Sequence, residues 1–143
     1  MKLHKLKHLD LSQRSKLSDL GLFMISLNCS KLENLDLSWC WKLTDVGVHS
    51  VVRHCSQLSH LNLCGVVKLL GRFLRDIPRK LPYLESLDLE QCPNIELSDL
   101  QDLLRKNTYL VIKEYNGDQV RMRRATRKNK CLAAQKERVQ ITF

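Results

Sequence analysis

Leucine residues recur along the chain with a period of 26 residues, and polar residues fill most positions between them. The recurring pattern is Leu-x-x-Leu-x-Leu with a further leucine six residues on, as at Leu32, Leu35, Leu37 and Leu43. Other copies begin at Leu6, Leu58, Leu84 and, as a half unit, Leu110. Self-similarity with a period of roughly 20 to 50 residues is typical of a solenoid of stacked supersecondary units.

Each copy of the pattern predicts a short strand. Residues two apart in a strand lie on the same face, so Leu35 and Leu37 are expected to point into the core while Asp36 points outward. One such unit has no partner for its sides. Its stability must therefore come from stacking against the units before and after it.

A helix is predicted after each strand. Thr44 and Asp45 suit a helix start, because they offer a capping oxygen and a negative charge to the positive end of the helix. The apolar stripe that follows has the helical spacing 0, 3, 4, 7 and comprises Val48, Val51, Val52 and Cys55. The sequence thus predicts an α/β solenoid of about four and a half units over residues 1–117, with a short parallel sheet on the concave side and helices on the convex side.

The third and the first units depart from this pattern. In the third, Pro78 stands where Val52 stands in the second, which is expected to break or shorten the helix at Ile77. In the fourth, Ser98 and Gln101 have the spacing of a capping box. The first unit begins in mid repeat with uncovered leucines, so the chain is expected to be a fragment or a shortened form of a longer protein.

The positive charge is concentrated at the end of the chain. Of a formal net charge of +9 over 143 residues, residues 118–143 contribute +6, which defines a predicted basic C-terminal tail. Its basic residues include Arg121, Arg123, Arg124, Arg127, Lys128 and Lys130. The tail could be a solvated disordered end, fold back across the concave face, or bind an acidic partner. Because it has no interleaved Trp or Tyr for base stacking, specific nucleic-acid recognition is not expected.

The sequence also indicates the cellular compartment in which the protein is expected. No apolar run reaches the roughly 18 residues that cross a bilayer, and the first residues alternate leucine with lysine and histidine, unlike a signal peptide. The sequence predicts a cytoplasmic or nuclear protein with no membrane partner.

Two cysteine pairs hold equivalent repeat positions, namely Cys29 with Cys55 and Cys40 with Cys92. Buried reduced thiols are therefore expected, not disulfides.

The second unit carries a family pattern, Cys29-x-x-Leu32-x-x-Leu35-x-Leu37-x-x-Cys40-x-x-Leu43-Thr44-Asp45-x-Gly47. It resembles the cysteine-containing subtype of leucine-rich repeat (LRR), and the resemblance runs from about Leu3 to Tyr115. Above all, it resembles the repeat region of F-box/LRR proteins, the substrate-binding subunits of SCF-type ubiquitin ligases. That resemblance implies recruitment of a protein substrate by the concave sheet and the C-terminal tail.

An F-box ahead of the repeats docks such proteins to the ligase, and no segment of this chain resembles one. Contact with SCF subunits is therefore expected only through an F-box that this sequence lacks. The alternative function is a free-standing LRR scaffold or regulatory binding protein that is unrelated to ubiquitin ligases.

Outward strand positions form three predicted columns on the concave face. The first is His8, Asn34, His60, Ser86 and Ile112, the second is Asp10, Asp36, Asn62, Asp88 and Glu114, and the third is Ser12, Ser38, Cys64, Glu90 and Asn116. The second column holds four carboxylates on strands about 4.8 Å apart, a distribution that favours a basic protein partner. In the alternative interpretation, aspartate recurs there because it helps to solvate the strand edge or bonds neighbouring backbone.

Trp39 and Trp41 bracket Cys40 just after the second strand. They are predicted either to form an exposed rim of the concave face, where Trp favours binding, or to pack on the loop of the next unit.

Signals of catalysis are weak. His4 and His8 are spaced as H-x3-H, but no Cys-x2-Cys pair accompanies them. No Gly-rich phosphate loop occurs, and the acidic residues are spread one per strand. The sequence therefore predicts a non-enzymatic protein without a metal site or a cofactor.

Overall fold

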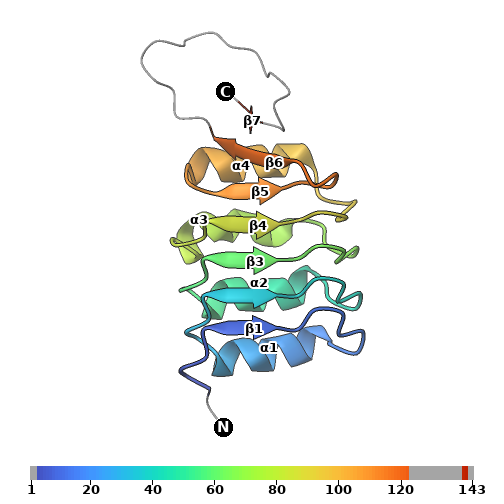
Figure 1. The fold of residues 1–143 in the computed structure, drawn as a ribbon, viewed down its shortest axis with the longest axis vertical. Helices are drawn as coiled ribbons and strands as arrows, with labels where there is room; N and C mark the ends of the chain where they lie inside the picture. The colour runs from blue at the N-terminus through green and yellow to red at the C-terminus, as the bar shows by residue number, and fades with distance from the viewer. Residues whose placement is uncertain (1–2, 123–139, 142–143) are drawn as a thin grey trace.

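The computed structural model describes residues 3–122 and 140–141, and shows a ladder of short strands with helices along one side of the sheet (Figure 1). The strands are β1 (His8–Asp10), β2 (Asn34–Asp36), β3 (His60–Asn62), β4 (Ser86–Asp88), β5 (Val111–Lys113), β6 (Gln119–Met122) and β7 (Gln140–Ile141). The helices are α1 (Asp19–Asn28), α2 (Asp45–His54), the 3-10 helix η1 (Arg72–Asp76), α3 (Ile77–Lys80) and α4 (Leu97–Lys106).

The strands form one sheet that follows the order of the sequence from β1 to β7. Strands β1 to β5 pair in parallel, and the register follows the repeat, with Leu9, Leu35, Leu61 and Leu87 opposite one another. From β2 onward these central leucines are buried against the helices. The predicted α/β class with a mostly parallel sheet is therefore confirmed. Within the described residues, none of the helices combines the length and apolar character needed to cross a membrane.

The aspartate two residues after the last leucine of a unit joins that unit to the next. Asp19 accepts hydrogen bonds from the Thr44 amide at 2.9 Å and from the Thr44 hydroxyl at 2.7 Å. One unit later, Asp45 is buried and accepts hydrogen bonds from the amides of Leu70 at 2.7 Å and Arg72 at 2.8 Å. Each carboxylate thus holds the turn that begins the following helix.

The third unit is irregular, as its sequence predicts. Gly71, with φ of 81°, stands where the first two units have this aspartate. The five-residue η1 and the four-residue α3 then replace a ten-residue helix. Pro78 lies in the first turn of α3, where an N–H group would have no intrahelical acceptor in any case.

The start of α4 differs from the prediction. The helix begins at Leu97 and has Glu96 as its N-cap residue, without a side-chain capping bond. Ser98 therefore lies inside the first turn, and its hydroxyl donates to the Glu96 carboxylate at 3.3 Å. The predicted capping box of Ser98 and Gln101 is wrong, because the helix starts one residue before Ser98.

Four of the five described cysteines are buried, and all five are free thiols: Cys29, Cys40, Cys55 and Cys92 are buried, and Cys64 is half-buried. The Cys40 thiol donates to the Leu11 carbonyl at 3.1 Å, and the Cys92 thiol donates to the Leu63 carbonyl at 3.2 Å. Each thus bonds the backbone of the preceding unit. Burial raises the pKa of Cys92 to about 12, so its thiol stays protonated. These contacts confirm the prediction of buried, reduced thiols for the four.

The C-terminal end of the sheet turns back on itself. Strand β6 pairs antiparallel with β5, and Val120 of β6 is buried opposite Ile112. Gly117 has φ of 82° in the turn between them, and the Glu114 amide donates to the Asp118 carbonyl at 2.9 Å. The sheet therefore continues beyond residue 117, the predicted end of the repeat domain. Strand β6 adds one more apolar side chain, Val120, to the core.

Strand β5 is shifted by one residue from its predicted register. Val111 lies opposite Ser86, and Lys113 lies opposite Asp88. The last unit is thus one residue shorter than the period of 26. As a result Ile112, predicted to face outward, is buried in the core.

Candidate functional site: the concave groove

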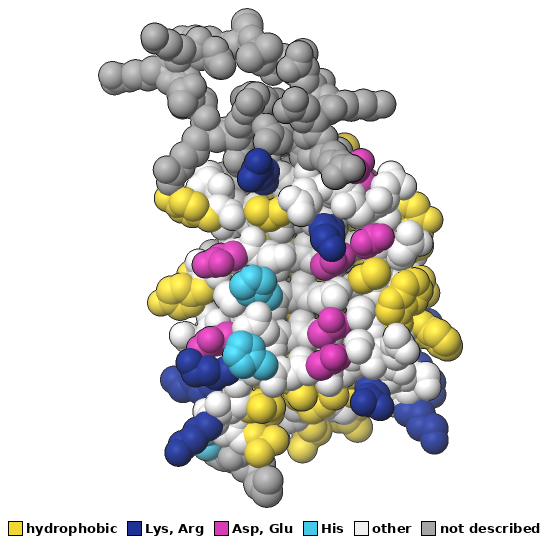
Figure 2. Space-filling view, viewed as in Figure 1, with side chains coloured by type: hydrophobic (Ala, Val, Ile, Leu, Met, Phe, Trp, Pro, Cys, Tyr) yellow, Lys and Arg dark blue, Asp and Glu magenta, His cyan; other side chains and the backbone are white. Residues whose placement is uncertain are grey.

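The outer face of the sheet forms an open groove with a volume of about 500 Å³. Its lining comes from β1 to β5 and comprises His8, Leu9, Asp10, Asn34, Leu35, Asp36, His60, Leu61, Asn62, Ser86, Asp88 and Lys113. Figure 2 shows this face, with histidine and acidic side chains in separate columns along the sheet. The structure therefore brings together most members of the first two predicted columns.

One acceptor atom at each second-column position of β1 to β4 has a structural task. The Oδ1 atom of Asp10 accepts a hydrogen bond from the Ser12 amide at 2.8 Å, and Oδ1 of Asp36 accepts one from the Ser38 amide at 2.8 Å. Asn62 and Asp88 accept in the same way from the amides two residues on, both at 3.0 Å. The interpretation that aspartate bonds neighbouring backbone is thus confirmed, and it explains why asparagine substitutes at position 62.

The second oxygens of Asp36 and Asp88 bond other members of the second column. Oδ2 of Asp36 accepts a hydrogen bond from the Asn62 side-chain amide at 2.9 Å. Oδ2 of Asp88 forms an ion pair with Nζ of Lys113 at 3.0 Å. This carboxylate raises the pKa of Lys113 above its ordinary value. Hydrogen bonding from Ser12 lowers the pKa of Asp10, so Asp10 is ionised at neutral pH.

The charge of the second column differs from the prediction. Because β5 is shifted by one residue, Lys113 replaces Glu114 as its fifth member. Glu114 instead lies at the start of the β5–β6 turn, where its Oε1 atom accepts from the Asn116 amide at 3.3 Å. The prediction that places Glu114 in this column is wrong. Three carboxylates and one ammonium remain, and the uncompensated charge is shifted toward Asp10 and Asp36.

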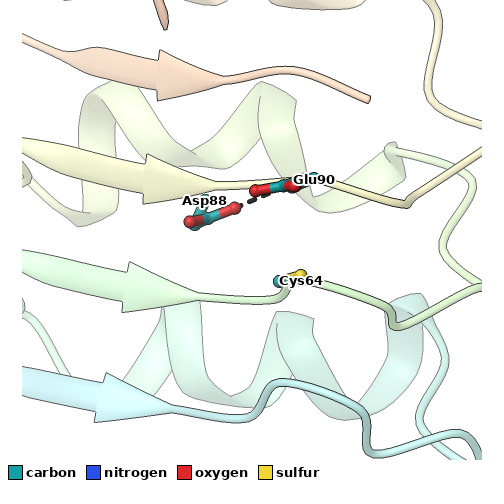
Figure 3. A group of neighbouring side chains, drawn as sticks. All are labelled: Cys64, Asp88 and Glu90. Carbon is teal, nitrogen blue, oxygen red and sulfur yellow. Dashed lines mark hydrogen bonds between the residues drawn. The ribbon is translucent and has the colours of Figure 1, made fainter. Parts of the chain in front are cut away.

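Two members of the third column, Cys64 and Glu90, form a compact cluster with Asp88 of the second column. Ligand-type atoms of Cys64, Asp88 and Glu90 lie within 4.8 Å of one another at the ends of β3 and β4 (Figure 3). Burial, followed by the two carboxylates, raises the pKa of the Cys64 thiol, which keeps its proton at neutral pH. Both oxygens of Asp88 already bind donors, one the Glu90 amide and the other Lys113. The cluster is therefore accounted for as part of the strand-end hydrogen-bond network.

Ser12 and Ser38, the other third-column candidates, lie at the same strand ends. The Ser38 hydroxyl donates to Oδ1 of Asp36 at 2.6 Å. Ser38 is buried by this arrangement, and Ser12 is half-buried. These two serines support the aspartates of the column and add little accessible surface to the groove.

The two tryptophans beside the groove lie in different surroundings. The backbone of Trp39 adopts φ of 61°, and its backbone amide donates a hydrogen bond to the Cys64 carbonyl at 2.8 Å. Its ring lies against Gly65, where an added Cβ would come within 2.5 Å of the ring. Trp41 is more open, with 56% of its surface exposed. Trp39 therefore packs on the next unit while both rings remain partly exposed at the rim.

The predicted basic tail is described at its beginning. Arg121 is exposed in β6, opposite Val111 of β5. The remaining tail candidates, Arg123, Arg124, Arg127, Lys128 and Lys130, lie outside the described residues. Docking of the tail across the groove stays a prediction.

Lys113 is the groove residue that the sequence prediction missed. A strict period of 26 requires an apolar side chain at position 113 and an outward one at position 112, yet these positions hold lysine and isoleucine. That inversion of polarity signals the one-residue shift. The pairing of Lys113 with Asp88 could therefore have been found from the sequence.

No family model matches the chain, and no curated protein matches it. Among solved structures, the chain is similar to the tropomodulin C-terminal domain studied in structural genomics of Caenorhabditis elegans. The TM-score is 0.57 and the sequence identity is 14%, over 78% of this chain and 74% of that chain. At this identity the similarity shows the fold alone, so the chain shares the architecture of that domain.

Proposed function

We propose that the chain is a leucine-rich-repeat module that binds another protein through its concave groove and has no catalytic role. One observation carries the proposal: outward side chains of five consecutive strands line a single open groove of about 500 Å³. Strand spacing fixes these side chains at intervals of about 4.8 Å, which suits an extended partner segment better than a small molecule. Solenoids commonly use such extended concave surfaces for binding.

The preferred segment is basic. Asp10 and Asp36 are neighbours on β1 and β2, and like charges directly opposite each other on paired strands are unfavourable. A lysine or arginine side chain of the partner between them relieves that repulsion. The pair of Lys113 with Asp88 supplies an internal example of an ammonium group held by this column.

Within this class, we propose substrate recognition for an SCF-type ubiquitin ligase, which rests on the resemblance of the second unit to F-box/LRR proteins. The alternative is a free-standing LRR scaffold. Copurification of the full-length gene product with the linker subunit of the ligase distinguishes the two. Failure to copurify contradicts the ligase role and leaves the binding role of the groove intact.

Variants that remove the aspartate charges but keep the turns test whether the groove binds a basic segment. Asparagine keeps the acceptor oxygen that the strand-end amide needs, as Asn62 demonstrates, so D10N and D36N variants retain the turn while losing the negative charge. Binding of fluorescently labelled Lys/Arg-rich peptides is expected to weaken by about tenfold in the double variant. The control is D102N, which removes an exposed carboxylate from α4. Equal loss in the control and the double variant would contradict the proposal.

A further inference from the structure

A second pocket, with a volume of about 310 Å³, lies beyond the carboxyl ends of β4 and β5 (Figure 1). Apolar side chains of the fourth unit line one part of it: Leu89, Cys92, Ile95, Leu97 and Leu100. The turn between β5 and β6 supplies the rest of the lining, with Glu114, Tyr115, Asn116 and Asp118. None of these residues lines the concave groove, so the pocket is a separate site.

The pocket occupies the place where the loop of a following unit packs elsewhere in the stack. Leu43 of the second unit is fully buried, whereas its equivalent in the fourth unit, Ile95, is only partly buried. At the loop position, Asp19 and Asp45 hold the turn of the following unit. The fourth unit has Leu97 at this position, and 50% of its surface is exposed. It therefore presents an apolar side chain where the first two units bond the next one.

The β5–β6 turn is held against the fourth unit by backbone hydrogen bonds. The Gln91 amide donates to the Tyr115 carbonyl at 3.1 Å, and within the turn the Glu114 amide donates to the Asp118 carbonyl at 2.9 Å. Strand β6 then continues the sheet beyond this turn. The described chain thus bounds the pocket on both sides, and the pocket is formed before any ligand arrives.

The turn makes one part of the pocket acidic. Within the described residues, neither Glu114 nor Asp118 forms an ion pair, and Glu114 accepts one hydrogen bond, from the Asn116 amide at 3.3 Å. The Glu90 carboxylate lies beside the same turn, because a Cβ atom added to Gly117 would come within 3.1 Å of it. Apolar and acidic groups therefore lie together, and no cation of the described chain neutralises the carboxylates of the lining.

We propose that this pocket binds a segment of a partner protein in which an aliphatic side chain is followed by lysine or arginine. The aliphatic side chain packs on Ile95 and Leu97, and the cation pairs with Glu114 and Asp118. Charge complementarity favours a basic residue and disfavours an acidic one. A lysine or arginine also packs its own carbon chain on apolar surface while its charged end stays at the carboxylates.

The size of the pocket agrees with this occupant. Ligand pockets commonly have volumes of about 300 to 1,000 Å³, and this one lies at the lower limit. It therefore suits one or two side chains of a protein segment. The site is independent of the concave groove, because Asp10 and Asp36 take no part in its lining.

Titration of the ¹⁵N-labelled 143-residue chain with synthetic hexapeptides, followed by NMR, tests the pocket. The first peptide has Leu-Arg at its centre, flanked by glycine and serine, and the other two have Ser-Arg or Leu-Glu there. The Leu-Arg peptide is expected to shift the amide signals of Leu97 and Asn116 in a saturable manner. Its dissociation constant at these signals is expected to be lower than those of the other two peptides by about tenfold. Equal affinity for all three, or shifts confined to the groove, would overturn the proposal.

Two variants test the two parts of the lining. Leu97→Ser and Asp118→Asn are each expected to weaken Leu-Arg peptide binding by about fivefold. The matched controls are Leu70→Ser, since Leu70 is also 50% exposed but does not line the pocket, and Asp102→Asn on the exposed surface of α4. Equal weakening by the controls would overturn the assignment. Binding that occurs only after removal of residues 123–143 would also overturn it, because the chain's own tail would then be the occupant.

Discussion

Aspartate recurs at two positions in the repeat, and the two positions have different structural tasks. At the strand position, one carboxylate oxygen holds the amide two residues on, as Asp36 does with Ser38. At the loop position, the whole carboxylate holds the next unit, as Asp45 does with two amides. Only the aspartates of the strand position line the groove. The acidic face is therefore partly a by-product of turn formation and partly available to a ligand.

Replacement of the loop aspartate is expected to loosen the contact between units. Asp45→Ala leaves the amides of Leu70 and Arg72, whose bonds to Asp45 are part-buried, without these acceptors, which costs about 1 to 3 kcal/mol of unfolding free energy. Urea denaturation followed by circular dichroism measures the loss. Asp102→Ala, on the exposed surface of α4, is the control and is expected to change stability by less than about 0.5 kcal/mol. A similar small change for Asp45→Ala would contradict this role.

Much of the candidate site could be predicted from single positions. The alternation of leucine with polar residues places His8, Asp36 and His60 on the outer face, where the structure has them. Lys113 was missed because a strict period was carried into the last unit, although the polarity of Ile112 and Lys113 contradicts it. That one oxygen of each strand aspartate bonds the backbone of the turn could not be predicted, since this bond depends on side-chain geometry at the strand end.

The turn after each strand is a shared element with a fixed backbone conformation. Its third residue beyond the strand adopts positive φ in the first four units, at Gln13, Trp39, Gly65 and Gln91. Three of these are not glycine, which is uncommon for this region of φ. The hydrogen bond from the Trp39 amide to the next turn accompanies this conformation. The ring of Trp39 in turn occupies the space that the absent side chain of Gly65 leaves open.

The turn of the third unit therefore has a specific need for glycine. Gly65→Ala adds a Cβ atom against the Trp39 ring and imposes positive φ on alanine, so a loss of about 1 to 3 kcal/mol in unfolding free energy is expected. A shift in tryptophan fluorescence reports the displaced ring. Gly21→Ala is the control, because Gly21 lies inside α1, where alanine is favoured. Unchanged fluorescence and stability in Gly65→Ala would show that the ring is not packed there.

The helices show how far local sequence decides an element. The apolar spacing of α2 and the oxygen of Thr44 predict its position, and the structure begins it at Asp45. Pro78 predicts an irregular third unit, yet the replacement of a helix by η1 followed by α3 depends on how this segment packs between α2 and α4. Local signals fix where a helix is possible, and packing against neighbouring units decides its form.

The whole molecule is a stack in which each unit is buried by its neighbours, so its ends are its weak points. At the C-terminal end, β6 covers the last parallel strand and buries Val120 on Ile112. In the first unit the apolar residues Leu6, Leu9, Leu11, Leu17 and Ile25 are only partly buried, whereas their equivalents in the second unit are fully buried.

Two truncations separate the role of β6 from that of the segment beyond it. A chain ending at residue 122 keeps β6 and is expected to retain its stability. A chain ending at residue 117 loses Val120 and exposes Ile112, which is expected to cost about 1.5 to 3 kcal/mol for each of these side chains. Thermal unfolding compares them. Equal stability of the two truncated chains would show that β6 does not close the sheet.

The longer truncated chain also tests tail docking. If the basic tail lies across the groove, removal of residues 123–143 is expected to raise hydrogen exchange around Asp36 and Asp88. Unchanged protection there would exclude docking of the tail, while the binding role of the groove would remain.

The sequence by itself determined the repeating unit, the parallel sheet and the outward columns, because the period of 26 residues and the alternation within each strand are properties of the linear chain. It also determined the buried thiols, which follow from their equivalent positions. The tertiary structure decided the form of the third unit, η1 followed by α3, and the cover that β6 supplies to β5. Each of these depends on contacts between units, and such contacts are set by how whole units pack against each other.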